Sequence, residues 1–161
     1  MMTIIQDTRE KVGTWDFTFY GVNQTIQGLK TGDYSVVGYE DVFAIERKKT
    51  SGEIATNLGT KREPFLREME RMSKLDYRYI ICEFPESCLD EFPKNSGIPK
   101  RFLSKIRMTG YMLKNSINMI KSKYGINFIF TSGKDEAEHV ALQLFSGLVS
   151  GVLPKANDEF F

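Results

Sequence analysis

The sequence has little of what a disulfide-stabilised protein or a histidine-based metal site needs. It contains two cysteines, Cys82 and Cys88, and one histidine, His139, among 161 residues. Cys82 falls within an apolar, strand-like run, so we expect a reduced core residue rather than half of a disulfide or a metal ligand. His139 stands between acidic residues on an expected helix and is interpreted as a surface residue. A histidine ligand set is therefore excluded.

Long hydrophobic runs are also missing. No apolar stretch approaches the length of about 20 residues that crosses a bilayer, and the first residues lack the basic-then-apolar pattern of a secretory signal. With 41% hydrophobic and 27% charged residues, the composition is typical of a globular protein. We therefore expect an intracellular protein of the cytoplasm, nucleoid or nucleus, without membrane contact. We expect one domain over residues 1–153 and a flexible C-terminal tail over residues 154–161.

Acidic residues are absent from residues 92–124, which contain eight Lys or Arg. The net charge of +1 hides this segregation, because residues 1–91 carry −4, residues 92–124 carry +8 and residues 125–161 carry −3. We expect one long helix over residues 100–124, on which Lys100, Arg107, Lys114 and Lys121 recur every seven residues and follow one face for about 31 Å. This basic stripe could be a solvated helix face. The absence of acids favours contact with nucleic-acid phosphates instead.

Apolar periodicity predicts alternating strands and helices. Strands are expected at residues 3–6, 33–37, 42–48, 77–84 and 126–130, with strands or extended structure at 15–20 and 23–29. Helices are expected at about residues 53–58, 64–75 and 100–124, and from 135 onward. The apolar face of the long helix would contain Phe102, Ile106, Leu113, Ile117, Ile120 and Tyr124. This order favours an α/β fold with a mixed sheet flanked by helices.

Residues 33–48 carry the clearest local signal. Two short apolar runs flank a four-residue turn at 38–41, as in a β-hairpin. With Val37 opposite Val42, the pairing places Asp33 directly opposite Glu46. Opposed residues have Cβ atoms about 5 Å apart, and two like charges at that distance are destabilising. A compensating cation is expected, and Mg²⁺, which takes carboxylates and keeps waters that a phosphate can displace, fits the pair.

The end of this hairpin carries two cations on opposite faces. Lys48 points to the same side as Glu46 because alternate side chains of a strand share a face, whereas Arg47 points away. Arg47 is expected to pair with an acid and fix the strand, or to reach a phosphate. The simpler alternative for the whole segment is a charged strand end exposed to solvent.

Four motifs resemble, in the same order, those of the XPF-type structure-specific endonucleases, which share the PD-(D/E)xK pattern. They are Asp7-Thr8-Arg9-Glu10, Gly32-Asp33-Tyr34, Ile45-Glu46-Arg47-Lys48 and the apolar run at residues 79–84. The resemblance covers roughly residues 3–84 and implies a restriction-endonuclease-like fold, an α/β mixed sheet flanked by helices. It also implies cleavage of phosphodiester bonds in branched or flap-like DNA, as in DNA repair and recombination. The implied cofactor is Mg²⁺, for which Mn²⁺ can substitute.

The resemblance also implies roles for individual residues. Asp33 and Glu46 would bind Mg²⁺, and Lys48 would orient the attacking water and stabilise charge on the phosphate. Arg47 joins them in the catalytic motif, and Asp7 would bind the same ion or a second one.

Two further residues are possible members of the site. Arg9 belongs to the first motif, although this stretch could also be a solvated strand end. Glu53 stands one position later, and is one methylene longer, than the aspartate that usually follows the Glu-Arg-Lys motif.

An alternative function is a catalytically weak module of the same fold that binds DNA or a partner subunit. The resemblance further implies a homodimer formed through the C-terminal helices. The last residues, Asp158-Glu159-Phe160-Phe161, resemble acidic-aromatic tails that dock on replication or repair proteins, although a disordered end is the simpler interpretation.

Overall fold

Six strands form one mixed sheet in the order β2-β1-β3-β4-β5-β6 in a computed structural model, which describes residues 1–156. The elements are β1 (Thr3–Gln6), the 3-10 turn η1 (Thr18–Tyr20), β2 (Asn23–Ile26), β3 (Tyr34–Val36), β4 (Phe43–Lys48), α1 (Ser51–Leu58), α2 (Arg62–Met72), β5 (Tyr77–Cys82), α3 (Ser87–Glu91), α4 (Lys100–Leu103), α5 (Gly110–Tyr124), β6 (Asn127–Phe130) and α6 (Lys134–Val149). Strand β3 runs antiparallel to β1 and β4, and the other neighbours are parallel. The predicted α/β fold with a mixed sheet is confirmed.

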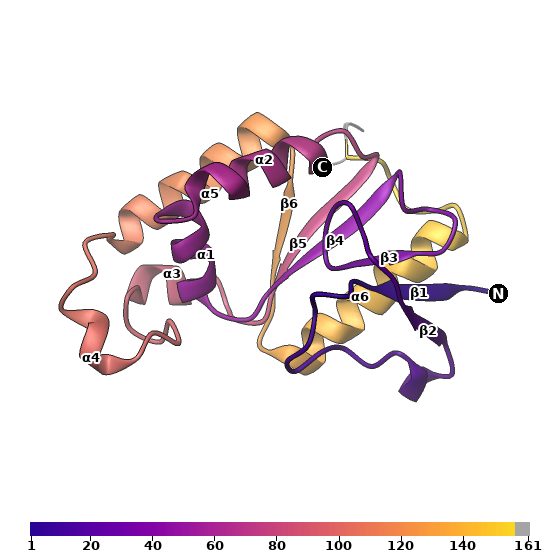
Figure 1. Cartoon of the computed structure of the whole chain (residues 1–161), viewed down its shortest axis with the longest axis horizontal. Helices are drawn as coiled ribbons and strands as arrows, with labels where there is room; N and C mark the ends of the chain where they lie inside the picture. Colours follow the sequence, from indigo (N-terminus) through magenta and orange to yellow (C-terminus); the bar gives the residue numbers. More distant parts are fainter. Residues whose placement is uncertain (157–161) are drawn as a thin grey trace.

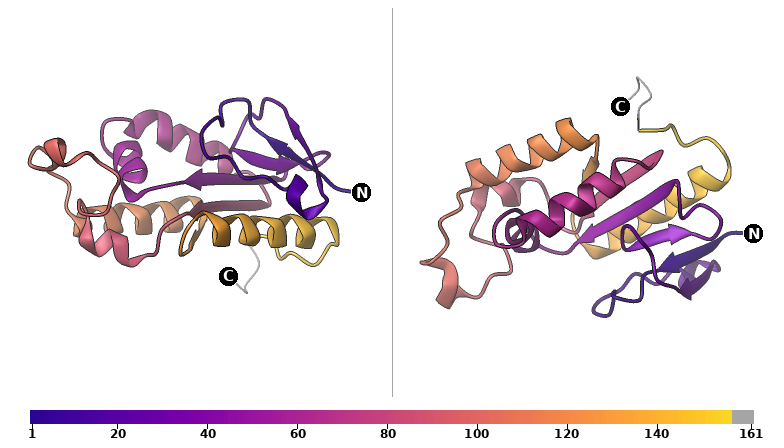
Figure 2. Two further views of the ribbon diagram at one scale, coloured as in Figure 1. Left: turned by 90° about the horizontal axis from the view of Figure 1, so that it is seen from below. Right: turned by 45° about the horizontal axis from the view of Figure 1, so that its top comes forward.

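Helices cover both faces of the sheet, with α1, α2 and α5 on one side and α6 on the other, where it packs on β4 and β5 (Figures 1 and 2). Alternate residues of the central strands serve the two cores. Ala44 and Ile80 pack with α1, α2 and α5, whereas Ile45 and Ile81 pack with Phe145 of α6. Strands buried on both faces are nearly continuously apolar, which explains the sequence of β5.

The two helices after β4 form where their capping and periodicity predict them. The Thr50 hydroxyl accepts a hydrogen bond from the Glu53 backbone N–H at 3.3 Å and caps α1, which ends before Gly59. Helix α2 buries Phe65 and Met69 on the face that its three- and four-residue spacing indicates. Both helices pack against the face of the sheet to which Ala44 of β4 points.

The single helix predicted over residues 100–124 is wrong. Helix α4 ends at Leu103, and α5 begins at Gly110 with Thr109 as its N-cap, whose hydroxyl accepts from the Met112 backbone N–H at 3.2 Å. Threonine favours a helix start and glycine disfavours a helix interior. A Cβ at Gly110 would also collide with the Leu89 carbonyl oxygen, so the chain turns where α5 meets α3.

The predicted apolar and basic faces of that helix change accordingly. Leu113, Ile117, Ile120 and Tyr124 are buried as predicted, but Phe102 is exposed. The single basic stripe does not exist, because its four cations belong to three different segments. Lys100 lies on α4, Arg107 in the following loop, and Lys114 and Lys121 on α5. Lys114 pairs with Asp90 of α3 at 2.8 Å.

Residues 12–31 form less strand than predicted. Only β2 is a strand, and it pairs in parallel with β1, while residues 15–20 form a loop and η1. The Trp15 backbone N–H donates to the Tyr34 hydroxyl at 3.0 Å, and the Phe17 N–H donates to the Gln24 side-chain oxygen at 2.8 Å. Because side chains satisfy these backbone donors, Trp15 and Phe17 can lie in the core without pairing to a neighbouring strand.

Two predictions concern the ends and surroundings of the chain. No helix within residues 1–156 has the length and apolarity that a membrane crossing requires. The Ala156 backbone N–H donates to the Asp76 carbonyl oxygen at 2.8 Å, so the start of the predicted tail contacts the body of the protein. The acidic-aromatic segment, residues 158–161, lies outside the described residues.

Candidate active site

The hairpin brings Asp33 and Glu46 together as predicted. Tyr34 pairs with Ile45, and this register places Asp33 opposite Glu46. The Asp33 carboxylate accepts a hydrogen bond from the Arg47 backbone N–H at 2.8 Å. Gly32 adopts a φ of +80°, and a Cβ there would lie 2.9 Å from that of Ala44, so only glycine can bring the chain so close to β4 before Asp33.

Glu46 and Lys48 share the face of β4 that is covered by α2. The Lys48 ammonium lies 3.3 Å from Glu46 Oε1 and 5.4 Å from the centre of the Phe65 ring. Both side chains are buried, with 8% of Glu46 and 7% of Lys48 exposed. Glu46 Oε2 is buried and has no hydrogen-bond partner in the described part of the chain. A buried carboxylate oxygen without a donor is costly unless a cation or proton reaches it.

Glu68 of α2 is a site residue that the sequence analysis missed. Its carboxyl group lies within hydrogen-bonding reach of Glu46, and burial together with the nearby Glu46 charge raises the pKa of Glu68 to about 8. A signal was present in the sequence, since Glu68 follows Phe65 by three positions and residues so spaced share a helix face. Asp33, Glu46 and Glu68 thus form a chain of three neighbouring carboxyl groups beside one ammonium.

Three carboxyl groups so close together cannot all be ionised without compensation. Burial, followed by the charges of Glu46 and Glu10, raises the pKa of Asp33 well above its usual value. Burial also disfavours the charged form of Glu46, but Lys48 and contacts with Glu68 and Asp33 outweigh it and lower the Glu46 pKa. Burial disfavours the charged form of Lys48, but the Glu46 and Asp33 charges raise its pKa, so Lys48 stays an ammonium ion. Of these three carboxyl groups, Glu46 is therefore the one that favours the ionised form.

Glu68→Gln is expected to stabilise the metal-free protein above about pH 8 and to change little near pH 4. Between the ordinary pKa of 4.5 and the folded-state pKa of about 8, the unfolded chain releases a proton that the folded protein retains. The free energy of unfolding consequently falls as the pH rises through this range, by on the order of a few kcal/mol. Glutamine cannot ionise, so the variant lacks this loss.

The measurement is chemical denaturation in EDTA across this pH range. Glu70→Gln, an exposed acid on the same helix, is the control and should keep the wild-type profile. A Glu68→Gln profile parallel to that of wild type would contradict the contact with Glu46.

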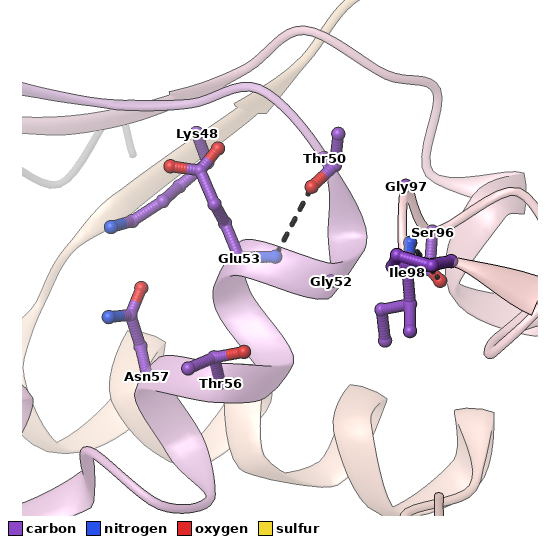
Figure 3. Close-up of a pocket in the computed structure, with 10 residues that line it drawn as sticks. Lys48, Thr50, Gly52, Glu53, Thr56, Asn57, Ser96, Gly97 and Ile98 are labelled. Atoms are coloured by element: carbon purple, nitrogen blue, oxygen red, sulfur yellow. Dashed lines mark hydrogen bonds between the residues drawn. The ribbon is translucent and has the colours of Figure 1, made fainter. Parts of the chain in front are cut away.

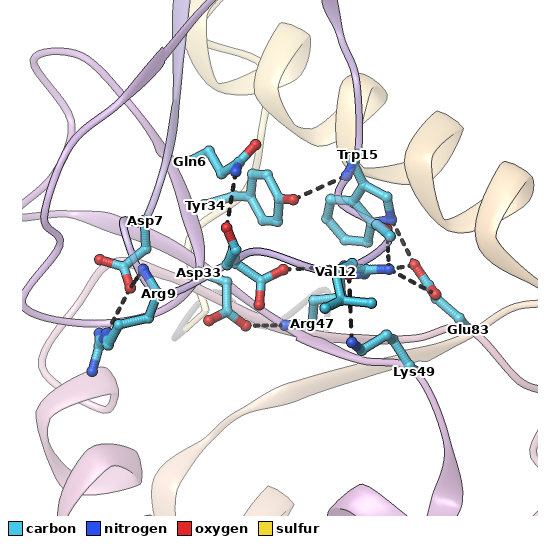
Figure 4. A network of polar contacts seen from close by, with 12 residues as sticks. Gln6, Asp7, Arg9, Val12, Trp15, Asp33, Tyr34, Arg47, Lys49 and Glu83 are labelled. Atoms are coloured by element: carbon cyan, nitrogen blue, oxygen red, sulfur yellow. Dashed lines mark hydrogen bonds and ion pairs between the residues drawn. The ribbon is translucent and has the colours of Figure 1, made fainter. Parts of the chain in front are cut away.

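Arg47 points to the opposite face of the sheet and is buried in a network of its own (Figure 4). Its guanidinium lies 2.7 Å from Glu83 of the segment after β5 and 3.1 Å from Glu10, and it is 5.6 Å from the centre of the Trp15 ring. The Trp15 indole N–H also donates to Glu83 at 2.7 Å. The expectation that Arg47 pairs with an acid is confirmed, and Glu10 is not a solvated strand end.

Arg47→Ala is expected to destabilise the protein by roughly 3–5 kcal/mol, because it leaves the Glu83 carboxylate buried without its cation. The free energy of unfolding from urea denaturation measures this effect. Arg67→Ala, which removes an exposed arginine from α2, should change stability by less than about 0.5 kcal/mol. A loss below 1 kcal/mol for Arg47→Ala would contradict the structural role of the network.

Asp7 and Arg9 lie at the edge of the hairpin and contact each other. The Asp7 carboxylate accepts from the Leu29 backbone N–H at 2.8 Å and from the Arg9 side chain at 2.6 Å. Burial favours the neutral acid, but these hydrogen bonds outweigh it and lower the pKa of Asp7. Both Asp7 oxygens thus have protein donors, and its role as a metal ligand stays a prediction. Arg9 remains 72% exposed and can reach solvent or a ligand.

Glu53 lies beside Lys48 on the wall of a cavity of about 350 Å³ (Figure 3). Its carboxylate accepts from the Lys49 backbone N–H at 2.7 Å, so Glu53 helps to cap α1 as well as facing the site. The cavity is also lined by Asn57 and, from the loop after α3, by residues 96–99. The cavity thus extends from Lys48 to that loop.

The donor set can hold a divalent cation. Among residues 1–156, no group of three or more His, Cys, Asp or Glu side chains is arranged to hold a metal ion. Mg²⁺, however, is commonly held by one or two carboxylates and completes its octahedron with waters and substrate phosphate oxygens. The ionised Glu46, with its unpartnered Oε2, and the opposed Asp33 supply such a pair.

Comparison with known proteins identifies the family. Residues 6–144 match the model of the ERCC4 domain family. The fold is similar to XPF from Aeropyrum pernix, with a TM-score of 0.64, 21% sequence identity, and coverage of 89% of this chain and 64% of that one. XPF from Aeropyrum pernix in complex with DNA gives a TM-score of 0.65, 20% identity, and coverage of 94% and 66%. No curated protein matches the chain.

The chain thus spans about two thirds of the length of these two structures. The family match covers the hairpin strands β3 and β4 and the helices α1 and α2 that follow them. The chain belongs to the ERCC4 domain family and is an XPF-type nuclease domain with the restriction-endonuclease-like fold.

Proposed function

We propose that the chain is a Mg²⁺-dependent endonuclease that cuts phosphodiester bonds in branched or flap-like DNA. The observation that carries this proposal is the buried, ionised Glu46, with one oxygen on Lys48 and the other without a partner, opposite Asp33. Three carboxyl groups gathered beside one buried ammonium would destabilise a purely structural strand end, because only protons or a further cation can compensate their charges.

Each residue of the site has a separate role in the proposed reaction. Mg²⁺ bound at Asp33 and Glu46 would polarise the scissile phosphate and lower the pKa of the attacking water. Lys48 stays charged beside Glu46, so its ammonium can orient that water and stabilise negative charge on the phosphate. Arg47 supports the strand from the other face and positions the backbone N–H that binds Asp33.

DNA is supported as the substrate by two independent features. One of the similar structures, XPF from Aeropyrum pernix, is a complex with DNA. The eight cations and no acids of residues 92–124 suit a polyanion. The preference for branched DNA rests on the family resemblance.

The direct test incubates the purified protein with labelled duplex, single-stranded, flap and junction DNA, with Mg²⁺, with Mn²⁺ and with EDTA. The expected result is cleavage of the branched substrates with either cation and none in EDTA. If every substrate stays uncut in Mg²⁺ and in Mn²⁺ while binding is retained, the chain is a DNA-binding module rather than a nuclease.

A further inference from the structure

Residues 93–109, which we call the arm, project from the body between α3 and α5. Figures 1 and 2 show α4 within the arm at the end of the molecule farthest from the N-terminus, away from the sheet. Ile98, Ile106 and Met108 of the arm pack against the core, but α4 between them buries no residue, so the stability of the fold does not account for α4.

The arm is strongly basic and unneutralised. Its cations are Lys94, Lys100, Arg101, Lys105 and Arg107, all of them exposed. None of the five has an ion-pair partner within residues 1–156, and residues 92–124 contain no acid. Five exposed cations without acids create a positive potential that attracts a polyanion.

Phe102 gives the arm a feature that electrostatics alone does not require. Its side chain is 41% exposed, while the neighbouring Leu103 and Ile106 are half-buried. The Arg101 guanidinium lies 4.6 Å from the centre of the Phe102 ring. An exposed aromatic ring surrounded by cations is the arrangement on which proteins stack unpaired nucleic-acid bases, with the cations following the backbone.

The base of the arm is fixed to the segment that leaves the catalytic strand. The Gly52 backbone N–H donates to the Ser96 carbonyl oxygen at 3.0 Å, and a Cβ at Gly52 would collide with that oxygen. Gly97, with a φ of +78°, approaches so closely that a Cβ would lie 2.9 Å from Thr50 Cγ2. These contacts follow Lys48 by only two to four residues, so the arm has a defined position relative to the candidate active site.

Two cavities give a continuous surface from Lys48 to the arm. The cavity beside Lys48 and a second one of about 540 Å³, which is lined by Lys94, Lys100 and Leu103, share residues 96–98. A strand that passes the active site can therefore continue along residues 96–98 to α4. The lining of this path includes Thr50 and Thr56, whose hydroxyls can donate to phosphate oxygens.

We infer that the arm binds an unpaired strand of the DNA substrate, with Phe102 stacked on a base and the arm cations on phosphates. This inference rests on the proposed function for the choice of DNA. It names a contact that would let the protein distinguish a fork or flap from continuous duplex, because only unpaired bases expose their faces for stacking.

The test measures binding in EDTA by fluorescence anisotropy, using a forked DNA, a single strand and a blunt duplex. Phe102→Ala is expected to weaken binding of the fork and the single strand about tenfold and to leave the duplex within about twofold. Phe102→Trp should restore binding. Phe19→Ala is the matched control, since Phe19 is 84% exposed and lies on η1, away from the arm.

Several results would overturn the inference. These are unchanged binding by Phe102→Ala, an equal loss on duplex, or an equal loss for Phe19→Ala. The charge contribution is checked with Lys100→Gln combined with Lys105→Gln, which should flatten the slope of log K against log[salt] on single strands by about 0.7 per lost contact. The pair Lys30→Gln and Lys74→Gln, exposed and outside the arm, should not flatten it.

Failure of the arm and failure of the nuclease proposal give different results. If the wild type binds forks through Phe102 but cuts none of them in Mg²⁺ or Mn²⁺, the nuclease proposal is wrong and the inference about the arm is supported. If the wild type cuts forks and Phe102→Ala binds them normally, the inference about the arm is wrong and the nuclease proposal is supported.

Discussion

Glu46→Gln is expected to lower cleavage of branched DNA by more than about 10³-fold in Mg²⁺ while the protein stays folded. The substitution removes the carboxylate that favours the ionised form, and with it the charge that would hold the cation. Losing a bound divalent ion forfeits several kcal/mol of transition-state stabilisation. Stability should change little, because Asp33 and Glu68, whose pKa values the Glu46 charge helps to raise, can ionise in its place and pair with Lys48.

The experiment combines cleavage rates with calorimetric titration of Mn²⁺ and thermal denaturation. Metal binding should weaken together with cleavage, and Asp33→Asn should behave in the same way. Glu70→Gln provides the matched control, because it removes an exposed carboxylate from α2. Cleavage by Glu46→Gln at the wild-type rate would show that the hairpin carboxylates do not hold the cation.

Lys48→Ala is expected to slow the chemical step by a factor on the order of 10² to 10³, the usual effect of losing one preorganised electrostatic stabiliser. Lys48 carries a raised pKa and lies 3.3 Å from Glu46, so its charge is held at the centre of the site at neutral pH. A lysine ammonium has no lone pair for a metal, so the affinities for Mn²⁺ and DNA should stay close to wild type.

The test is single-turnover cleavage with saturating enzyme, which separates chemistry from binding. Lys49→Ala is the control, since Lys49 follows on the chain and its ammonium lies 3.4 Å from the Val12 carbonyl oxygen instead of in the site. A Lys48→Ala protein that cuts at the wild-type rate, or that loses DNA affinity instead of rate, would assign Lys48 to binding rather than to catalysis.

The hairpin and the placement of its charged side chains could be predicted from the sequence because they depend on local rules. The turn at residues 38–41 fixes the register, and the two-residue period of a strand then separates Glu46 and Lys48 from Arg47. The structure has this arrangement, with Tyr34 opposite Ile45 and the two sides of β4 in different polar networks. Helix α6 buries Ala137, Ala141 and Phe145, which are four residues apart and therefore lie on one face of the helix.

Contacts that join distant segments could not be predicted. Arg47 is expected to find an acid, but nothing local indicates Glu83, 36 residues away. Helical spacing places Glu68 on the same face of α2 as Phe65, but it does not show that this face lies beside Glu46. The prediction of one long basic helix was wrong for another reason. Lys100, Arg107, Lys114 and Lys121 recur every seven residues, and this spacing continues across the break that Thr109 and Gly110 introduce.

The Arg47 network joins the hairpin to segments that precede and follow it in the sequence. Its partners come from residues 10–15 at the start of the sequence and from Glu83 beyond β5, so this one guanidinium joins the first and the middle thirds of the chain. The hairpin lies between them and is complete by residue 48, yet the contacts that hold Arg47 come from both flanking segments. Transplanting residues 32–53 alone into another scaffold would therefore transfer the motif without the support that orients it.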